Sequence, residues 1–233
     1  MRKTLVIVQK EARELFRNRS VMLIGLAFVI FFSISYSLGI TRSEAGTTMT
    51  LDGTLFYLSL SIALFMAYVS TAQLFLIEKR EAVIETLMCA PVSLRQIWLG
   101  KALSGVIPSW LMSVSAVVLT LVVSSILSGA LLLPGIAIVI HVIIVVPTFI
   151  AAFIGLVGFG QLLLGMRENR ILNFVLFVPA FAALYGSGYA IASGITASWQ
   201  YMAILFAASL IVLGISSYLT RYLSRERIVT TIE

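Results

Sequence analysis

The sequence predicts an all-α membrane protein with six transmembrane helices, an amphipathic interfacial helix at the N-terminus and a cytoplasmic helix between spans two and three. Two observations lead to this prediction. The 233 residues are 60% hydrophobic and only 11% charged, whereas a soluble domain has roughly 45–50% apolar and 25% charged residues. The few charges also lie in short clusters between long uncharged stretches. We therefore expect a single transmembrane domain over residues 1–233, with lipid as its main solvent.

The uncharged stretches set the number of spans. Residues 20–41 and 53–77 are each long enough for one helix, because a span needs about 20 apolar residues. The stretches 102–166 and 171–220 have basic residues at both ends, so each must cross the membrane an even number of times if positive flanks stay inside. Glycine, serine and proline residues divide each of them in two. The predicted spans are about 20–41, 53–77, 102–128, 135–165, 171–191 and 199–220.

The basic residues predict the orientation. With these spans, 15 of the 16 lysines and arginines fall on one side, and only Arg42 falls on the other. Basic residues are enriched in cytoplasmic loops, so both termini are expected in the cytoplasm and the chain in the plasma (inner) membrane. The first apolar run, 21–40, is long enough to span and has no clear cleavage site, so we expect a retained helix. The net charge of +6 comes from these flanks, which favours membrane lipid over nucleic acid as a partner.

The leader 1–19 is amphipathic at helical spacing. Its apolar positions on one face are Leu5, Val8, Ala12, Leu15 and Phe16, and its charged positions on the other are Lys10, Arg13, Glu14 and Arg17. Such a helix would lie along the cytoplasmic interface, with its cations near anionic headgroups. Two interpretations stay open: a simple positive-inside anchor, or an elbow helix that positions span one.

Residues 78–101 form the only cytoplasmic segment between spans that is long enough for structure of its own. Residues 78–88 suit a helix, and Pro91 breaks it, because proline lacks an amide donor and clashes with the preceding turn. Ser93 followed by Gln96 is a capping box that predicts the start of a second helix. The segment is charged on one side and apolar on the other. It is either a docking site for a cytoplasmic partner or a solvated loop.

The same segment resembles the cytoplasmic signature of type-2 permeases of ATP-binding-cassette transporters. That signature is a charged run, then Gly-Thr-x-Glu-x-Leu-Leu, then Pro-Val-Ser, then Gly-Lys at the start of span three. The matching residues here are Glu78-Lys79-Arg80-Glu81, Glu85-Thr86-Leu87-Met88, Pro91-Val92-Ser93 and Gly100-Lys101. Lys10-Glu11 and Arg17-Asn18-Arg19 also resemble the family's Lys-Glu and Arg-Asp-Arg before span one. Ala82-Val83 departs from the family's Gly-Thr.

The resemblance implies a permease subunit of an exporter that forms the substrate pathway and is not itself an enzyme. ATP and magnesium would bind to a separate cytoplasmic ATPase subunit, and the permease would work as a homodimer or a paired permease. The expected ATPase-coupling residues are Glu78, Arg80, Glu81, Glu85, Leu87, Pro91 and Ser93, and those of the interfacial helix are Lys10, Glu11 and Arg17. The chain's own Gly100-Lys101 fails as a phosphate-binding loop, because Arg95 replaces the first glycine and Ala102 follows the lysine.

The predicted spans contain no aspartate, glutamate, lysine or arginine. His141 is the only histidine, and an ionisable residue inside a membrane is a functional candidate, although a neutral, hydrogen-bonded histidine is the favoured interpretation. Gln73 and Gln161 could line a path or bond between helices. Glycines such as Gly155 and Gly158 permit close helix contact, for example at a subunit interface. No cluster has the spacing of a metal site.

Two alternatives belong to other classes. A stand-alone secondary transporter would usually carry inverted repeats and buried charges at the midplane, and neither is visible in the sequence. An assembly or maturation subunit that uses an ATPase partner without transporting anything would carry the same cytoplasmic signature. The absence of formal charge from the predicted spans favours an amphipathic or hydrophobic cargo over a multiply charged one.

Overall fold

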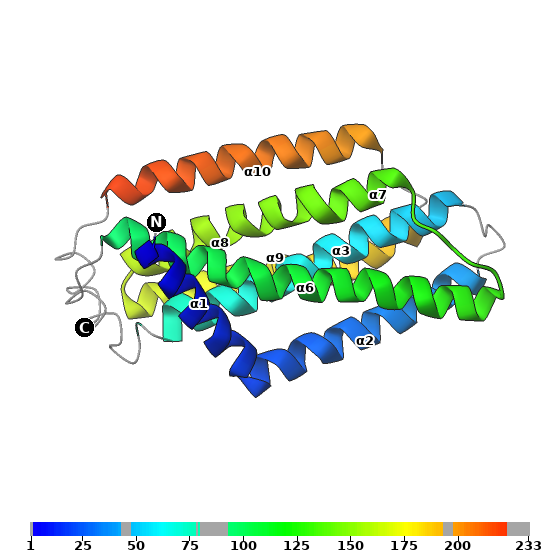
Figure 1. Ribbon diagram of the computed structural model, residues 1–233, viewed down its shortest axis with the longest axis horizontal. Coiled ribbons are helices and arrows are strands. Elements are labelled where there is room, and N and C mark those ends of the chain that lie inside the picture. Colours follow the sequence, from blue (N-terminus) through cyan, green and yellow to red (C-terminus); the bar gives the residue numbers. More distant parts are fainter. Residues whose placement is uncertain (1, 43–47, 78, 80–92, 193–197, 223–233) are drawn as a thin grey trace.

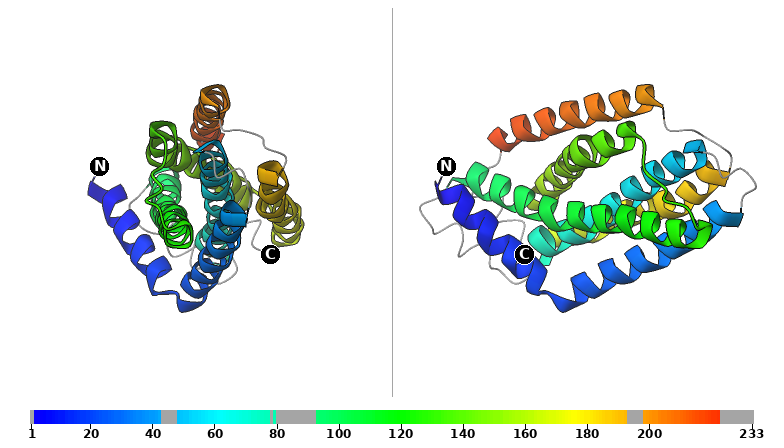
Figure 2. Two further views of the ribbon diagram at one scale, coloured as in Figure 1. Left: turned by 90° about the vertical axis from the view of Figure 1, so that its right-hand side faces the viewer. Right: turned by 45° about the vertical axis from the view of Figure 1, so that its right-hand side comes forward.

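The chain folds into a bundle of long helices whose axes lie roughly along the long axis of the molecule (Figures 1 and 2). The computed structural model describes residues 2–42, 48–77, 79, 93–192 and 198–222. Within these ranges all regular structure is helical. The elements are α1 (Arg2–Arg17), α2 (Arg19–Arg42), α3 (Thr48–Thr71), η1 (Ala72–Ile77), α6 (Leu94–Ser128), α7 (Ile136–Ile140), η2 (His141–Val145), α8 (Val146–Leu163), α9 (Met166–Ala192), α10 (Trp199–Leu219) and η3 (Thr220–Tyr222).

Five helical stretches in the described part of the chain are long and apolar enough to cross a membrane. They are Arg19–Thr41, Leu51–Ile77, Leu94–Ser128, Ile136–Leu163 and Trp199–Leu219. They coincide with five of the six predicted spans, and the chain is a multi-pass helical membrane protein by length and composition. The remaining predicted span, 171–191, lies within α9, which is not among the five. That span stays a prediction.

The start of span three differs from its predicted position. The expected capping box is present, but the helix that begins there is α6, which runs without a break for 35 residues. The expected second helix of the 78–101 segment is therefore continuous with span three. Gly100 lies within this helix, and its lack of a side chain allows α1 to approach. A Cβ added at Gly100 would lie 2.6 Å from the Cγ2 atom of Ile7.

Span four contains a wide turn in its N-terminal half. The helix runs from Ile136 to Leu163, but His141–Val145 form a π-helical turn. Pro147 lies two residues after this turn, at the second position of α8. Because proline has no N–H and its ring clashes with the preceding turn, the backbone before it cannot keep regular α-helical bonding. The wide turn accommodates that defect, as single π-turns in α-helices do.

Small polar residues join α2 and α3 to α6. The Ser113 hydroxyl donates to the Ser59 carbonyl oxygen of α3 at 2.8 Å, and the Ser33 hydroxyl of α2 donates to the Ala116 carbonyl oxygen at 3.1 Å. Ser37 reaches the Thr120 carbonyl oxygen of α6 at 3.2 Å. Each of these serines is fully buried. Since lipid provides no hydrophobic drive between helices, such short side chains and hydrogen bonds hold the spans together.

Gly155 and Gly158 of span four face the interior of this chain. A Cβ at Gly158 would lie 2.6 Å from the Phe75 ring, and one at Gly155 would lie 3.1 Å from the Trp98 ring. The predicted close helix contact is confirmed. The suggestion that these glycines belong to a subunit interface is wrong, because aromatic side chains of η1 and α6 already occupy the space beside them.

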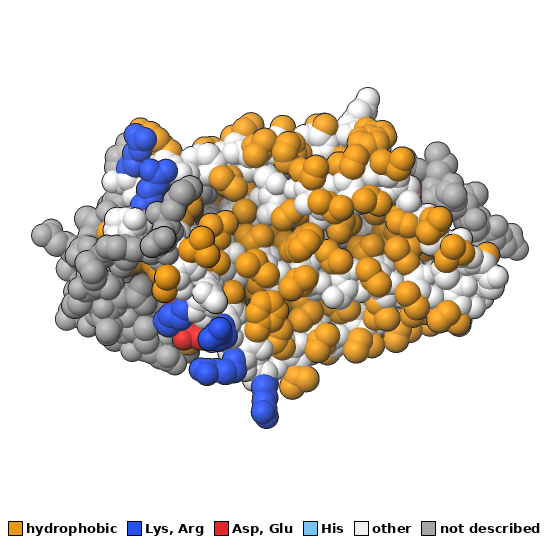
Figure 3. Space-filling model, viewed as in Figure 1, with side chains coloured by type: hydrophobic (Ala, Val, Ile, Leu, Met, Phe, Trp, Pro, Cys, Tyr) orange, Lys and Arg blue, Asp and Glu red, His pale blue; other side chains and the backbone are white. Residues whose placement is uncertain are grey.

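The surface is divided along the length of the bundle. In the view of Figure 3, hydrophobic side chains cover the middle, and the lysines and arginines gather toward one end. The exposed apolar residues include Phe31 of α2, Ile126 of α6, Phe174 of α9 and Ile211 of α10. A soluble protein rarely exposes so continuous an apolar surface. This pattern is typical of a bundle that is surrounded by lipid.

Candidate functional site

The candidate site is segment 78–101, which was predicted to be cytoplasmic and resembles the permease signature, together with the residues that hold its two ends. Of the predicted coupling residues, Glu78, Arg80, Glu81, Glu85, Leu87 and Pro91 lie outside the described residues. The structure describes Lys79 before the segment and Ser93 after it. The contacts of these two flanks show which helices are attached to the segment.

The downstream flank begins with the predicted capping box. The Ser93 side chain accepts from the Gln96 backbone N–H at 3.3 Å, and the Gln96 side chain accepts from the Ser93 N–H at 3.1 Å. Ser93 is itself in extended backbone geometry, as an N-cap residue should be. Each bond satisfies a donor that the first turn of a helix otherwise leaves unpaired. The prediction for Ser93 is confirmed as a structural role, namely the start of α6.

One turn further on, α6 is attached to α8. The indole Nε1–H of Trp98 donates to the carbonyl oxygen of Gly155 at 3.1 Å, and Trp98 is buried. Gly155 permits this contact because a side chain there would press on the Trp98 ring. The downstream flank is therefore fixed to the middle of α8 by a buried hydrogen bond.

The upstream flank is attached to the C-terminal end of α8. Lys79 is fully buried, and its Nζ donates to the carbonyl oxygens of Leu162 and Leu164 at 3.3 and 2.6 Å. These carbonyl groups end the helix and have no intrahelical donor, so a lysine there satisfies them and complements the negative end of the helix dipole. Burial lowers the pKa of Lys79, and the nearby negative charge of Glu168 acts in the opposite direction.

The turn from α8 to α9 is closed by side chains of α9. Asn169 is fully buried, and its Nδ2 donates to the carbonyl oxygens of Gln161 and Leu164, both at 2.9 Å. The Glu168 carboxylate accepts from the Gly165 N–H at 3.1 Å. Leu164 therefore receives bonds from Lys79 and from Asn169 at the same carbonyl oxygen. Through this carbonyl oxygen, the upstream flank of the segment is linked to the start of α9 as well as to α8.

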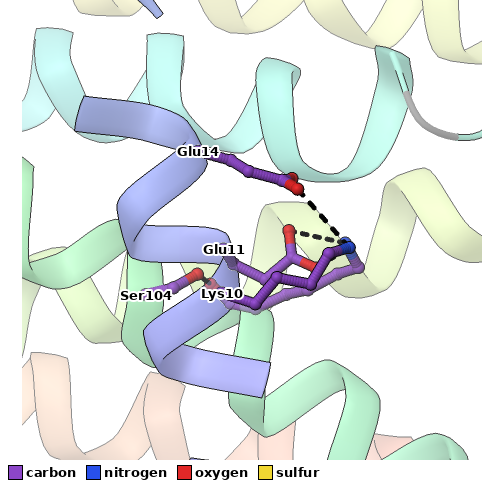
Figure 4. Close-up of polar contacts among 5 residues, drawn as sticks. Lys10, Glu11, Glu14 and Ser104 are labelled. Atoms are coloured by element: carbon purple, nitrogen blue, oxygen red, sulfur yellow. Dashed lines mark hydrogen bonds and ion pairs between the residues drawn. The ribbon is translucent and has the colours of Figure 1, made fainter. Parts of the chain in front are cut away.

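A buried ion pair attaches α1 to α6 close to the same place. Lys101 Nζ lies 3.2 Å from Glu11 Oε2, and each side chain is 1% exposed. Figure 4 shows the Lys10 ammonium between Glu11 and Glu14, at distances of 3.5 and 3.7 Å from their carboxylate oxygens. Charges removed from water require such mutual compensation. Lys101, at the end of the signature, is therefore a buried partner of the N-terminal helix.

The sequence placed Lys10, Glu11 and Arg17 in the interfacial helix, and the structure shows where each points. Glu11 faces α6 and Lys10 spans two carboxylates, whereas Arg17 is exposed at the end of α1. Sequence reasoning missed Lys79 and Lys101 as interior residues. One signal existed: each is a lysine next to a span boundary, where a long side chain can bend back toward the polar atoms of neighbouring helices.

The intramembrane candidates separate into different environments. His141 is fully buried against Phe56, with ring centroids 4.4 Å apart, and neither ring nitrogen has a hydrogen-bond partner among the described residues. The hydrogen bond of the favoured interpretation is therefore not found among these residues. Gln161 Nε2 donates to Asn173 Oδ1 at 3.2 Å, so Gln161 bonds between α8 and α9. Gln73 is half-buried on η1.

No group of three or more histidine, cysteine, aspartate or glutamate side chains in the described ranges could hold a metal ion. Comparisons with protein-family models, with curated proteins and with solved structures give no match for this chain. Function must therefore be argued from the residues and geometry of the site.

Proposed function

We propose that the chain is the transmembrane permease subunit of an ATP-binding-cassette exporter, coupled to a separate ATPase subunit through residues 78–101. The observation that carries the proposal is the combination of the signature-like segment with flanks that are both bonded to α8. A push on such a segment would move α8 directly, through Lys79 at its end and Trp98 at its middle. In a permease that works by ATP-driven rearrangement, this is the required path from the cytoplasm to the spans.

The arrangement of the helices supports the six-span topology of the proposal. The start of α1 and the end of α10 lie at the same end of the bundle, and α9 runs along its length (Figures 1 and 2). A chain that begins and ends on one side of a membrane crosses it an even number of times. With α9 as the sixth span, both termini and the 78–101 segment are cytoplasmic, in agreement with the distribution of basic residues.

The proposed division of labour follows from the same residues. This chain forms the pathway, and its partner binds ATP and magnesium and hydrolyses ATP. The active unit contains two permease subunits, identical or paired, in the plasma (inner) membrane. The lack of formal charge within the predicted spans favours an amphipathic or hydrophobic cargo over a multiply charged one.

The test is affinity purification of the tagged chain in mild detergent, followed by mass identification of the proteins that accompany it. We expect a stoichiometric ATPase with a phosphate-binding loop, and we expect Glu85→Arg to remove it because the substitution reverses a charge within the proposed docking segment. Arg170→Glu is the matched control, since it reverses an exposed charge at the same end of the bundle outside the segment.

Two results would contradict the proposal. The first is a monodisperse membrane protein that brings no nucleotide-binding partner in any of several detergents, which would favour a stand-alone carrier. The second is an ATPase that stays bound to Glu85→Arg as well as it does to the control. An ATPase partner without any transport of amphipathic compounds in reconstituted vesicles would instead indicate an assembly subunit.

A further inference from the structure

The N-terminal helix α1 has three sectors where the sequence suggested two. The inner sector faces α6 and contains the buried residues Glu11 and Leu15. A second sector is apolar but exposed: Leu5 is 67% and Phe16 is 43% exposed. The third sector carries the basic residues. The sequence grouped Leu5, Leu15 and Phe16 on one face, but only Leu15 is used for packing within the chain.

The charges of α1 compensate one another only in part. Lys10 and Lys101 lie against Glu11 and Glu14, so this network holds two positive and two negative charges and is neutral as a whole. Arg13, Arg17 and Arg19 are all exposed, and no ion pair in the described part of the chain involves any of them. Within the described residues, three positive charges around the elbow between α1 and α2 therefore have no acidic partner. Figure 3 shows basic side chains gathered around this elbow.

Covalent continuity places this elbow at a membrane boundary. The first candidate span begins at Arg19, and α1 ends two residues earlier. The exposed apolar side chain of Phe16 precedes Arg17 directly, so apolar and basic groups alternate at the depth where acyl chains meet headgroups. Helices with this arrangement lie in the interface, with the apolar sector inserted and the cations at the phosphates.

We infer that the outer sectors of α1, with Arg13, Arg17 and Arg19, bind the headgroups of anionic phospholipids in the adjoining leaflet. The neutral network of Lys10, Glu11, Glu14 and Lys101 holds the helix in place, and the three arginines provide the charge that selects the lipid. An acidic protein segment would also complement the arginines. The exposed apolar sector and the adjoining span favour lipid. The inference depends on the membrane spans and not on the identity of an ATPase partner.

The experiment measures which lipid lies next to α1 in a bilayer. Gln9 is exposed on α1, and Cys89 is the only cysteine. A Gln9→Cys/Cys89→Ser chain can therefore be labelled with a bimane at one position and reconstituted into phosphatidylcholine vesicles. Brominated phosphatidylglycerol or brominated phosphatidylcholine is then added as a minor component. Bromine quenches the bimane only at short range, so the ratio of the two quenching efficiencies reports local enrichment of the anionic lipid.

We expect brominated phosphatidylglycerol to quench about threefold or more better than brominated phosphatidylcholine, since each basic residue near an anionic surface contributes on the order of 1 kcal/mol, or about fivefold. Arg13→Gln/Arg17→Gln/Arg19→Gln should bring the ratio close to one. Arg167→Gln/Arg170→Gln, which removes exposed charges at the α8–α9 turn, should leave it unchanged. High salt should reduce the ratio for the parent chain, a result that does not depend on any variant folding.

Three outcomes would overturn the inference. Equal quenching by the two lipids in the parent chain would show that α1 does not select charge. Equal loss of preference in the triple variant and in the α8–α9 control would show a general effect of the basic end. No quenching by either lipid would show that the helix is covered by something other than lipid, and an acidic protein segment would then be the occupant to consider.

Discussion

The buried pair of Glu11 and Lys101 provides the sharpest test of how α1 is held. Both side chains are 1% exposed and their charged atoms are 3.2 Å apart, so neither is screened by water. Removing one partner of such a pair leaves an uncompensated buried charge, which costs about 3–5 kcal/mol. We expect Glu11→Leu to lower the free energy of unfolding by this amount. Lys101→Met should fall at the lower end of the range, because Lys10 still lies 3.5 Å from Glu11.

The double variant distinguishes an ion pair from two independent contributions. Replacing both partners by apolar residues of similar volume is often neutral or even stabilising, by about 1–4 kcal/mol. Glu11→Leu/Lys101→Met should therefore recover most of the stability that either single change removes. Lys10→Met is the control: its side chain is 52% exposed, and exposed ion pairs contribute only about 0–1 kcal/mol.

The assay is titration of the purified protein with sodium dodecyl sulfate in mixed micelles, with unfolding followed by circular dichroism. The four free energies form a double-mutant cycle whose coupling term isolates the pair. The reasoning is refuted if the double variant loses the sum of the two single losses. It is also refuted if Lys10→Met is as damaging as Lys101→Met, because compensation would then not depend on burial.

Two further predictions use the same unfolding assay. Gly158→Ala should destabilise the protein by about 1–3 kcal/mol, because the new Cβ would lie 2.6 Å from the Phe75 ring. The control is Gly160→Ala, which should be neutral or stabilising because its Cβ would meet Leu172 at an ordinary 3.5 Å. Equal effects of the two substitutions would contradict this packing. Lys79 has a pKa that burial lowers from its usual 10.5, so the unfolded chain binds this proton more readily than the folded one. Stability relative to Lys79→Met should therefore rise as the pH increases from the lowered pKa toward 10.5, and a difference that falls over this range would contradict the assignment.

The helical class and most of the spans could be predicted because they depend on local properties. Long uncharged runs bounded by charges give helices of membrane-spanning length whatever their neighbours are. The capping box at Ser93 is also local, since donor and acceptor lie three residues apart, and it was correctly predicted. The contact of Gly100 with α1 could not be predicted in this way, because Ile7, which fills the space beside the glycine, lies 93 residues earlier in the chain.

The candidate site could be predicted only in part. The signature-like motif identified the segment, but its meaning depends on what holds its flanks. The partners of Lys79 lie more than 80 residues away, on the last turn of α8. The pairing of Glu11 with Lys101 joins residues 90 positions apart, and amphipathic periodicity assigned Glu11 no special place in the leader. His141 could be placed within a span, but its contact with the Phe56 ring depends on the packing of two helices.

By itself, the sequence determined that this is a helical membrane protein, where most spans lie and which segment resembles a docking signature. These properties follow from composition and spacing, because the bilayer imposes the same length and the same hydrogen-bonding requirement on every span. Tertiary structure decided which charges are buried, which are exposed, and which helix each flank of the segment contacts. A helix presents several faces at once, and only its packing against other helices determines which face is covered. That is why Arg13 and Arg17 of α1 and Arg19 of α2 are exposed while Glu11 lies in the interior.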